Sequence, residues 1–456
     1  VLLIECAGRA RITWHTDLVC AGRDADAPAV VTAYADGLLT AENVRADAPE
    51  LFSAAAGMPL TGWTCDRFSF LRGQMDARTG AGLSPCFALE GTVDRQGVIV
   101  CGCDTRANLL RLTQPDEAAH ALRATRERWL GAVSRLWMTT PDADMNRYLG
   151  GWAAYQALCC RLLARTSLYQ NGGAFGFRDQ LQDAVNLLLL DNTPACEQIG
   201  RACAHQFAAG DVCHWWHEGA GTEHGVRTRI SDDLLWLPWA VCEYVEKTGD
   251  AEILSAEYPF LAGEELEENE HDRYQPLEPG AERGTVLEHC RRALMRVLAR
   301  GVGAHGLLLI GTGDWNDAFD RVGAQGRGES VWLTWFFAIT ARKFAALVGG
   351  HAAEQLCLAA DHCTRAAEDA WDGAWYRRGY YDDGRPLGSA GNDECRIDAI
   401  AQAFAALDTH ADRGRVHTAL TSAVEQLFDR EHNVVRLFDP PITRRTPETG
   451  YVRSYG

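Results

Sequence analysis

Two carboxylates close to an indole make residues 311–317 (GTGDWND) the segment best suited to acid catalysis. Asp314 and Asp317 are three residues apart, with Trp315 between them. An indole that excludes water from a carboxyl group raises its pKa, and an acid that stays protonated near neutrality can donate a proton to a leaving oxygen. The segment therefore indicates a general acid. The alternative is an Asx turn that holds a structural tryptophan.

A second polar segment, residues 169–183 (YQNGGAFGFRDQLQD), combines glycines with charged side chains. Its glycines permit close approach of the backbone to a ligand, and Arg178 and Asp179 follow them. A helix here would place Asp179 and Asp183 on one face. The alternative is an ordinary helix N-terminus whose acidic residues complement the helix dipole.

Two arginines alternate in the third segment, residues 214–233, in a protein with a net charge of -18. Paired guanidiniums such as Arg227 and Arg229 suit a bound phosphate or other oxyanion, or a buried carboxylate. The competing interpretation is a salt bridge to Asp232 or Asp233.

The same region is rich in aromatic and histidine side chains. Trp215 and Trp216 could stack on a sugar ring or could belong to the core. A zinc site is not favoured, because the spacing of the possible ligands fits no usual finger and His217-Glu218 lacks a second histidine four residues on. Those possible ligands are Cys213, His214, His217 and His224. We therefore expect no metal.

Two further segments carry weaker signals. Residues 381–398 gather polar side chains ahead of an apolar stretch, which favours an acidic helix N-terminus. Residues 323–328 (GAQGRG) are glycine-rich, but they lack the Lys-Ser/Thr and the preceding strand of a phosphate-binding loop.

The elements that position these segments change character along the chain. Residues 1–112 contain short apolar runs, 86–93 and 97–103, separated by Asp94-Arg95-Gln96, and predict part of an antiparallel β-sandwich. Residues 113–141 predict a helical linker whose helix begins at Pro115 and runs to about Met138.

From residue 142 a helical period dominates. Thr285 and Glu288 form a capping box, and an apolar stripe follows it. The stripe consists of Val286, Cys290, Ala293, Leu294 and Val297. Residues 397–407 and 416–427 carry further apolar stripes. No fixed repeat length is present, which favours a closed α/α barrel over residues 142–456 rather than a solenoid. The expected fold is thus mainly α.

Composition limits the possible partners. Hydrophobic residues make up 47% of the chain and charged residues 23%, as in globular proteins. The negative net charge disfavours nucleic acid and acidic membrane surfaces. No membrane-spanning segment or signal peptide is predicted, and the 16 cysteines indicate reduced thiols of a cytoplasmic protein. The chain begins with Val1, and we expect it to be a fragment or a processed chain.

Several of these segments together resemble glycoside hydrolase family 94, the family of cellobiose and chitobiose phosphorylases. Within it they are most similar to the phosphorylase-like domain of cyclic β-1,2-glucan synthases. The resembling segments are FGFRDQLQD, VRTRISDDLLWLPWA, GTGDWND, GRGESVWLTWF and NDECRIDAIAQ, preceded by FLRGQMDARTGAGLSPCFAL. They cover nearly the whole chain in the order of the family. The fold that the resemblance implies is a β-sandwich, a helical linker and an (α/α)6 barrel over residues 142–456.

The resemblance implies an inverting phosphorylase that cleaves a β-linked gluco-oligosaccharide with inorganic phosphate and gives α-glucose 1-phosphate. It implies that Asp317 is the proton donor and that Trp315, Arg178 and Asp179 line the donor-sugar subsite, with Arg165 as a further candidate. The motif that contains Arg227 and Arg229 also matches, without a role for either. No cofactor is implied beyond phosphate as co-substrate.

Two departures from the family pattern bear on these expectations. Ala318 and Phe319 replace the glycine and methionine that usually follow the aspartate, which could reshape the acceptor side. Family members also continue beyond the chain's end into a phosphate-binding histidine and a Thr-Gly pair. We therefore expect the barrel to be truncated at its C-terminus and to lack part of the phosphate site.

Two other functions remain open from the sequence. An inverting hydrolase would need a second carboxylate about 6.5–9.5 Å from the acid. A glucan-binding domain that controls chain length within a membrane-bound synthase would place the protein at the cytoplasmic side of the inner membrane. The family resemblance also allows a homodimer.

Overall fold

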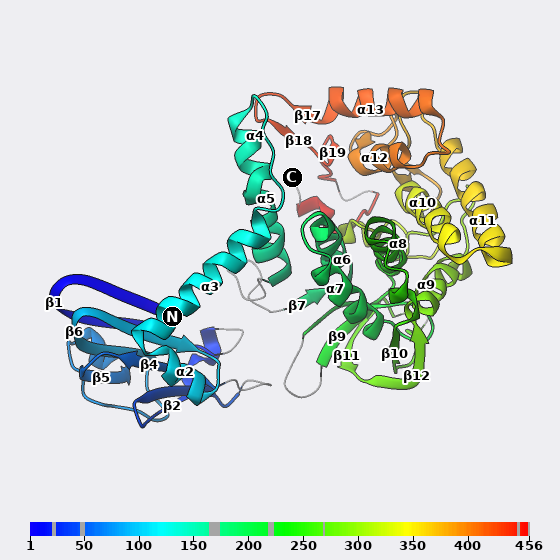
Figure 1. Cartoon of the computed structure of the whole chain (residues 1–456). Coiled ribbons are helices and arrows are strands. Elements are labelled where there is room, and N and C mark those ends of the chain that lie inside the picture. The colour runs from blue at the N-terminus through cyan, green and yellow to red at the C-terminus, as the bar shows by residue number, and fades with distance from the viewer. Residues whose placement is uncertain are drawn as a thin grey trace. The chain divides into compact units, whose positions relative to one another are not determined.

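The computed structural model describes residues 1–20, 24–45, 51–163, 174–217, 223–267, 270–444 and 447–454 (Figure 1). Two compact units result, here called the sheet unit (Val1–Ala174 with His217–Glu223) and the helical unit (Phe175–Trp216 with His224–Gly456). The predicted boundaries after residues 112 and 141 both fall inside the sheet unit, and the helical unit begins at Phe175.

Six antiparallel strands form the sheet of the first unit. They are β1 (Leu2–Asp17), β2 (Val30–Ala35), β3 (Leu38–Asn43), β4 (Phe52–Gly57), β5 (Leu60–Asp66) and β6 (Pro85–Gly102). The order is β1-β6-β4-β3-β2, and β5 also pairs with β6. Buried residues of several strands, including Leu39, Phe87 and Ile99, form the core of this sheet. The antiparallel sheet agrees with the expectation, and its assignment as part of a β-sandwich stays a prediction.

The separation predicted between residues 86–93 and 97–103 is wrong, because both runs belong to the single strand β6. Arg95 adopts a left-handed conformation with φ 73°, and the register between β1 and β6 shifts between Glu5 and Arg9. An irregularity of this kind bends a strand without ending it. The charged tripeptide therefore lies inside the strand.

Helix α1 (Arg67–Leu71) lies between β5 and β6, and the other helices of the first unit follow the sheet. They are α2 (Arg106–Leu112), α3 (Pro115–Val133), α4 (Ala143–Arg147) and α5 (Ala153–Tyr155), with helical turns at Tyr148–Trp152 and Gln156–Leu163. Helix α3 begins at the predicted Pro115 but ends five residues before Met138. The hydroxyl of Ser134 donates a hydrogen bond to the carbonyl of Leu130 there, at 2.5 Å. A side chain that bonds to the last turn competes with continuation of the helix.

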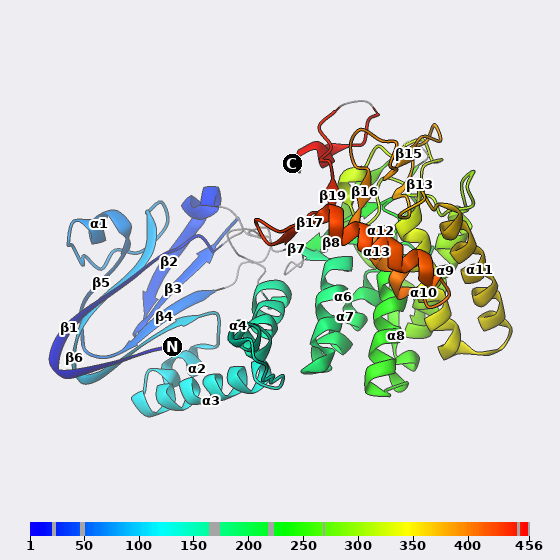
Figure 2. The same cartoon turned by 90° about the horizontal axis from the view of Figure 1, so that it is seen from above.

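The helical unit contains α6 (Phe177–Asn186), α7 (Thr193–Ala204), α8 (Trp236–Thr248), α9 (Val286–Arg300), α10 (Val331–Val348), α11 (Gly350–Asp369), α12 (Ala399–Leu407) and α13 (Arg413–Leu427). Consecutive helices pack against each other, as α6 and α7, α10 and α11, and α12 and α13 do (Figure 2). The mainly helical class of this unit is as expected. Closure into an (α/α)6 barrel stays a prediction.

Short strands connect these helices. A four-stranded sheet has the order β11-β9-β8-β7. Its strands are β7 (Ala174–Gly176), β8 (Cys213–His217), β9 (Glu223–Thr228) and β11 (Asp272–Leu277). Three further sheets have two strands each: β10 (Glu257–Leu261) with β12 (Pro279–Thr285), β16 (Ile397–Asp398) with β19 (Phe438–Asp439), and β17 (Phe428–Asp429) with β18 (Val434–Val435). A three-stranded sheet places β14 (Gly379–Tyr380) between β13 (Glu329–Ser330) and β15 (Pro386–Leu387).

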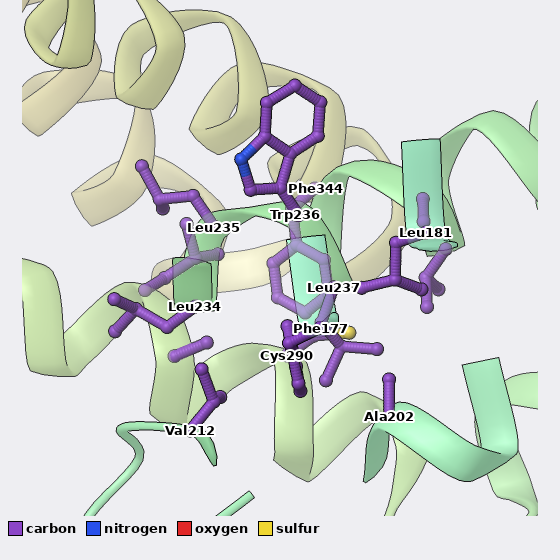
Figure 3. Packing of buried hydrophobic residues seen from close by; sticks show 14 of the residues in the cluster. Phe177, Leu181, Ala202, Val212, Leu234, Leu235, Trp236, Leu237, Cys290 and Phe344 are labelled. Carbon is purple, nitrogen blue, oxygen red and sulfur yellow. The ribbon is translucent and has the colours of Figure 1, made fainter. Parts of the chain in front are cut away.

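A continuous apolar core holds the helices together. Phe177 and Leu181 of α6 meet Ala202 of α7, Trp236 of α8 and residues of other helices in one cluster (Figure 3). Burial of each large apolar side chain contributes roughly 1.5–3 kcal/mol. This core fixes the helix ends, and the loops that leave those ends carry the polar segments singled out in the sequence.

Helix α10 corrects the expectation that no stretch could span a membrane. By length and composition it is apolar enough to cross one, yet 67% of its residues are buried within the protein. Its charged residues also have partners there, since Arg342 pairs with Asp408 at 2.9 Å and Lys343 pairs with Glu243. These contacts are those of a core helix.

The predicted helix patterns are confirmed in part. All five stripe residues of α9 are buried, and Thr285 accepts a hydrogen bond from the backbone N–H of Glu288 at 3.2 Å. In a complete capping box the carboxylate of Glu288 would accept a hydrogen bond from the backbone N–H of Thr285. Here that carboxylate binds Arg291 and Arg292 instead. The stripe over 397–407 is shorter than expected, since Ile397 lies in β16 and Leu407 is exposed.

Candidate active site

The segment 311–317 reaches its position through a buried apolar run and two glycines. Leu307, Leu308 and Ile310 are buried, and Gly311 and Gly313 have φ values of 63° and 129°. A Cβ atom at Gly311 would lie 2.4 Å from the carbonyl oxygen of Arg229. Glycine is therefore required where this turn passes the 214–233 segment.

The two aspartates of this segment have different surroundings. Asp314 is fully buried, and its carboxylate accepts hydrogen bonds from both terminal nitrogens of Arg378, each at 2.6 Å. The hydroxyl of Ser330 donates a third bond at 2.6 Å. The side chain of Asp317, in contrast, is 33% exposed and lines a cavity of about 290 Å³. Asp314 is thus structural, whereas Asp317 is open to a ligand.

Asp317 is held by two cationic side chains from other elements. Arg178, at the start of α6, donates from Nη2 to Oδ1 of Asp317 at 2.8 Å. His214 of β8 places Nε2 3.6 Å from Oδ2 of Asp317 and Nδ1 2.8 Å from Oδ2 of Asp233. Arg178 also bonds Asp232 at 3.2 Å. The candidate acid therefore belongs to a charged network that joins α6, β8 and the start of α8.

The network sets the protonation of its members. Burial raises the pKa of Asp317, but the nearby positive groups His214 and Arg178 outweigh this effect and hold that pKa below the ordinary value. Burial lowers the pKa of His214, but Asp233 and Asp317 raise it to about 10. The raised pKa expected for Asp317 from Trp315 is therefore not found. Trp315 is half-buried and packs against the helical core.

Sequence reasoning missed much of this network. Asp232 is fully buried, and desolvation raises its pKa to about 7 against the opposing charge of Arg178. From the sequence, Asp232 is expected only as a salt-bridge partner of the segment's arginines, and His214 only as a possible zinc ligand. No sequence signal points to Arg378. One signal in the sequence could have indicated the network. Asp232 and Asp233 directly precede the apolar run 234–240, and burying unpaired charges there would cost free energy, so cationic partners are expected.

The predicted arginine pair separates in the structure. Arg227 is 1% exposed, and its Nε and Nη2 bond the two carboxylate oxygens of Asp211 at 2.7 and 2.8 Å. A buried carboxylate is thus its partner, and that carboxylate belongs to Asp211 rather than to Asp232 or Asp233. Arg229 binds the backbone carbonyls of Leu266, Glu267 and Glu270 and lines a second cavity.

The remaining predicted donor-side residues lie at the edge of the network or outside the description. Asp179, in the first turn of α6, is 57% exposed, with Oδ1 3.9 Å from Nε of Arg178. Arg165 lies outside the described residues.

The two tryptophans of β8 differ in the same way as the two aspartates. Trp216 is fully buried and stacks on His205 with ring centres 3.8 Å apart, so its role is core packing. Trp215 is half-buried, and its ring lies 5.7 Å from that of Tyr274. Trp215 is thus partly accessible, and its stacking on a sugar ring stays a prediction.

The glycine-rich segment 323–328 binds a carboxylate of its own chain. The backbone N–H groups of Gln325, Arg327 and Gly328 donate to the carboxylate of Asp382 at 2.8 to 2.9 Å. These donors are therefore already used, in agreement with the weak phosphate-loop signal.

Comparison with known proteins identifies the family. The catalytic-domain model of the glycosyl hydrolase 94 superfamily matches residues 128–456. The chain belongs to glycosyl hydrolase family 94. The resemblance stated from the sequence motifs is thereby confirmed.

Three relatives illustrate the range of this family. The chain is 41% identical over 409 residues to the cyclic β-(1,2)-glucan synthase NdvB of Rhizobium meliloti, covering 88% of this chain and 14% of the synthase. It is 28% identical over 391 residues to the 3-O-β-D-glucopyranosyl-β-D-glucuronide phosphorylase of Paenibacillus borealis, covering 83% and 48%. It is 27% identical over 199 residues to the 1,2-β-oligoglucan phosphorylase of Listeria innocua, covering 43% and 17%. The chain spans less than half the length of each relative.

Proposed function

We propose that this family 94 chain is the catalytic part of an inverting glycoside phosphorylase that cleaves a β-1,2-glucan or oligoglucoside and gives α-glucose 1-phosphate. The observation that carries the proposal is the contrast between the two aspartates of the GTGDWND segment. Asp317 lines a cavity, whereas Asp314 is fully engaged by Arg378. Two of the relatives are named for β-1,2-linked glucans, which supports this linkage.

The chemistry needs one carboxyl group because phosphate is already an anion. Asp317 gives its proton to the glycosidic oxygen, and the bond between C1 and that oxygen breaks. A phosphate oxygen forms the new bond to C1 from the opposite face of the ring. The product is therefore the α-anomer, and Asp317 is left as a carboxylate.

The low pKa of Asp317 in the structure sets a condition for this step. The carboxyl group must regain a proton when substrate binds. An anion placed beside Arg178 would offset the guanidinium charge and raise the pKa of Asp317. His214, whose pKa is about 10, keeps its own proton, so the carboxyl group takes its proton from water when substrate binds.

Arg178, Trp315 and Asp179 are proposed to hold the donor sugar around Asp317. Arg178 is anchored by Asp232 and by the backbone carbonyl of Asp314, both at 3.2 Å, so its position is fixed before substrate arrives. Trp315 offers an indole face next to the acid. Arg165 remains a proposed member of the same subsite.

Phosphorolysis by the protein as it occurs in its organism tests the proposal. β-1,2-Gluco-oligosaccharide and phosphate are incubated with the protein, and α-glucose 1-phosphate is followed by phosphorus NMR. We expect product with the wild type and a loss of 10²- to 10⁴-fold or more with Asp317→Asn, the range for removal of a general acid. Glu354→Gln, which changes an exposed carboxylate of α11, is the control. An Asp317→Asn variant with wild-type activity would contradict the assignment of Asp317 as the general acid.

A second candidate function is a glucan-binding domain that controls chain length in a larger membrane-bound synthase. The observation in its favour is the 41% identity to a synthase of which the chain covers 14%. Calorimetry with β-1,2-glucans separates the two functions. Binding without phosphorolysis by the natural protein would favour chain-length control, whereas turnover would favour the phosphorylase.

A hydrolase is the third candidate, since Asp272 and Asp320 line the same cavity as Asp317. Asp320 accepts a hydrogen bond from the backbone N–H of Tyr451 at 3.1 Å and contacts Arg321 at 3.2 Å, so it is partly engaged. Release of glucose in phosphate-free buffer, lost on Asp272→Asn, would support hydrolysis.

A further inference from the structure

A second cavity of about 550 Å³ adjoins the one at Asp317, and three arginines line it. Thr228, His271 and Thr312 line both cavities. The arginines are Arg229, Arg296 and Arg300, and their cavity is here called the arginine pocket. All of its lining residues belong to the helical unit.

The positive charge of the arginine pocket exceeds its negative charge. Arg229 donates only to backbone carbonyls, and Arg300 donates to the carbonyl of Ile230 at 3.2 Å. Within the described part of the chain, neither forms an ion pair with a carboxylate. Arg296 pairs with Glu265, but its Nε is buried without a hydrogen-bond partner.

The acidic residue Asp211 neutralises this excess only in part. Its carboxylate lines the pocket, but both of its oxygens bind Arg227. Burial lowers the pKa of Arg300; the charges of Asp211 and Asp233 oppose this effect, and the charges of Arg296 and Arg229 add to it. An anion bound here would stabilise guanidiniums that now repel one another.

The size of the pocket suits more than an inorganic ion. Its volume lies within the range of about 300–1,000 Å³ typical of small-molecule sites. A sugar ring that carries an acid group would place that group against the arginines while its glycosidic oxygen reached toward Asp317.

We propose that the arginine pocket is an oxyanion subsite beside Asp317. It binds either the acid group of a charged sugar on the leaving-group side or the phosphate co-substrate. The inference rests on the proposed function for its place in the reaction, but binding of the anion can be measured without turnover.

Isothermal titration of the natural protein with sodium glucuronate, inorganic phosphate and glucose tests the subsite. Arg300→Gln removes one guanidinium, and we expect it to weaken anion binding by roughly tenfold to a hundredfold, as loss of a charged hydrogen bond does. Arg291→Gln is the matched control, because Arg291 lies on the same helix, pairs with Glu288 and does not line the pocket. Arg300→Lys keeps the charge but loses the planar guanidinium group. Its affinity for the anion should therefore lie between that of the wild type and that of Arg300→Gln.

The outcomes separate the two sources of the oxyanion. Loss of glucuronate binding in Arg300→Gln, with phosphate binding retained, assigns the pocket to an acidic sugar. Loss of phosphate binding assigns it to the co-substrate. The proposal is overturned if folded Arg300→Gln binds both anions as tightly as the wild type, or if the wild type binds neither more tightly than glucose.

Turnover distinguishes this inference from the proposed function. Arginine-dependent anion binding without phosphorolysis would leave the subsite standing and remove the phosphorylase. If the protein cleaves neutral oligosaccharides with phosphate, and its anion binding does not depend on Arg300, the phosphorylase stands and the subsite is removed.

Discussion

At the scale of the residue, Asp314 and Asp317 belong to one heptapeptide but differ in what surrounds them. Asp314 neutralises a guanidinium that is itself fully buried, and Asp317 faces a cavity. A buried ion pair that loses one partner leaves an uncompensated charge in a medium that solvates it poorly. The cost of removing each carboxylate should therefore differ even though the chemical change is the same.

We predict that Asp314→Asn lowers the free energy of unfolding by about 3 kcal/mol, because Arg378 loses its bidentate partner and keeps Asp398, 3.4 Å from its Nε, as its remaining carboxylate among the described residues. Asp317→Asn should cost much less, since its side chain is partly exposed. Urea unfolding followed by circular dichroism measures both. Equal losses in the two variants would contradict the structural role given to Asp314.

His214 gives a prediction with a defined pH window. Its pKa of about 10 in the folded protein exceeds the ordinary 6.5, so its protonated form is stabilised by folding. That contribution is complete below about pH 6.5 and disappears as pH rises toward 10. The stability difference between wild type and His214→Gln should therefore be larger at pH 6 than at pH 9, by roughly 2–3 kcal/mol.

Urea unfolding at both pH values measures this difference, and His351→Gln, at an exposed position of α11, is the control. A difference that stays constant between pH 6 and pH 9 would show that His214 is not charged in the folded protein.

Residue types could be predicted from the sequence, but partners could not. The acids beside an indole indicate a general acid somewhere in residues 311–317, and the family resemblance implies that it is Asp317. Arg178 is 139 positions from Asp317, and Arg378 is 64 positions from Asp314. Contacts over such separations depend on how helices pack, so the lowered pKa of Asp317 could not be deduced from its neighbours in sequence.

At the scale of the element, periodicity predicted well where one face is buried along the whole helix. The stripe of α9 is an example, because each of its residues meets the helical core. The strand β6 was divided wrongly, since a charged tripeptide resembles a turn when the bulge that accommodates it is unknown. Helix α12 began later than predicted because Asp398 caps it and Ile397 pairs with β19.

The N-terminus of α9 provides a test at this scale. Thr285→Ala removes the hydroxyl that accepts the N–H of Glu288, and we predict a loss of about 1 kcal/mol. Thr285→Ser keeps that acceptor and should recover most of the loss. Both are measured by chemical unfolding. No difference between alanine and serine would mean that the cap contributes nothing to stability.

At the scale of the whole molecule, family membership and the charge distribution guide interpretation more than any single element. The net charge of -18 means that a phosphate or acidic sugar approaches a protein that repels it at long range. The arginine pocket, whose lining holds more arginines than carboxylates, offsets that repulsion locally. A family assignment alone would not locate this offset, because it depends on which arginines have carboxylate partners and which do not.

The same excess of acidic residues predicts how salt affects stability. Like charges destabilise the compact state through repulsion over distances up to the Debye length, which is about 30 Å at 0.01 M salt and about 10 Å at 0.1 M. Buried pairs such as Asp314–Arg378 and Asp211–Arg227 are screened much less. Raising sodium chloride from 0.01 to 0.15 M should therefore increase the melting temperature by roughly 2 °C or more. Scanning calorimetry measures the change, with equal osmolality of sucrose as the control for solvent effects. A melting temperature that falls over this range would show that exposed ion pairs outweigh the repulsion.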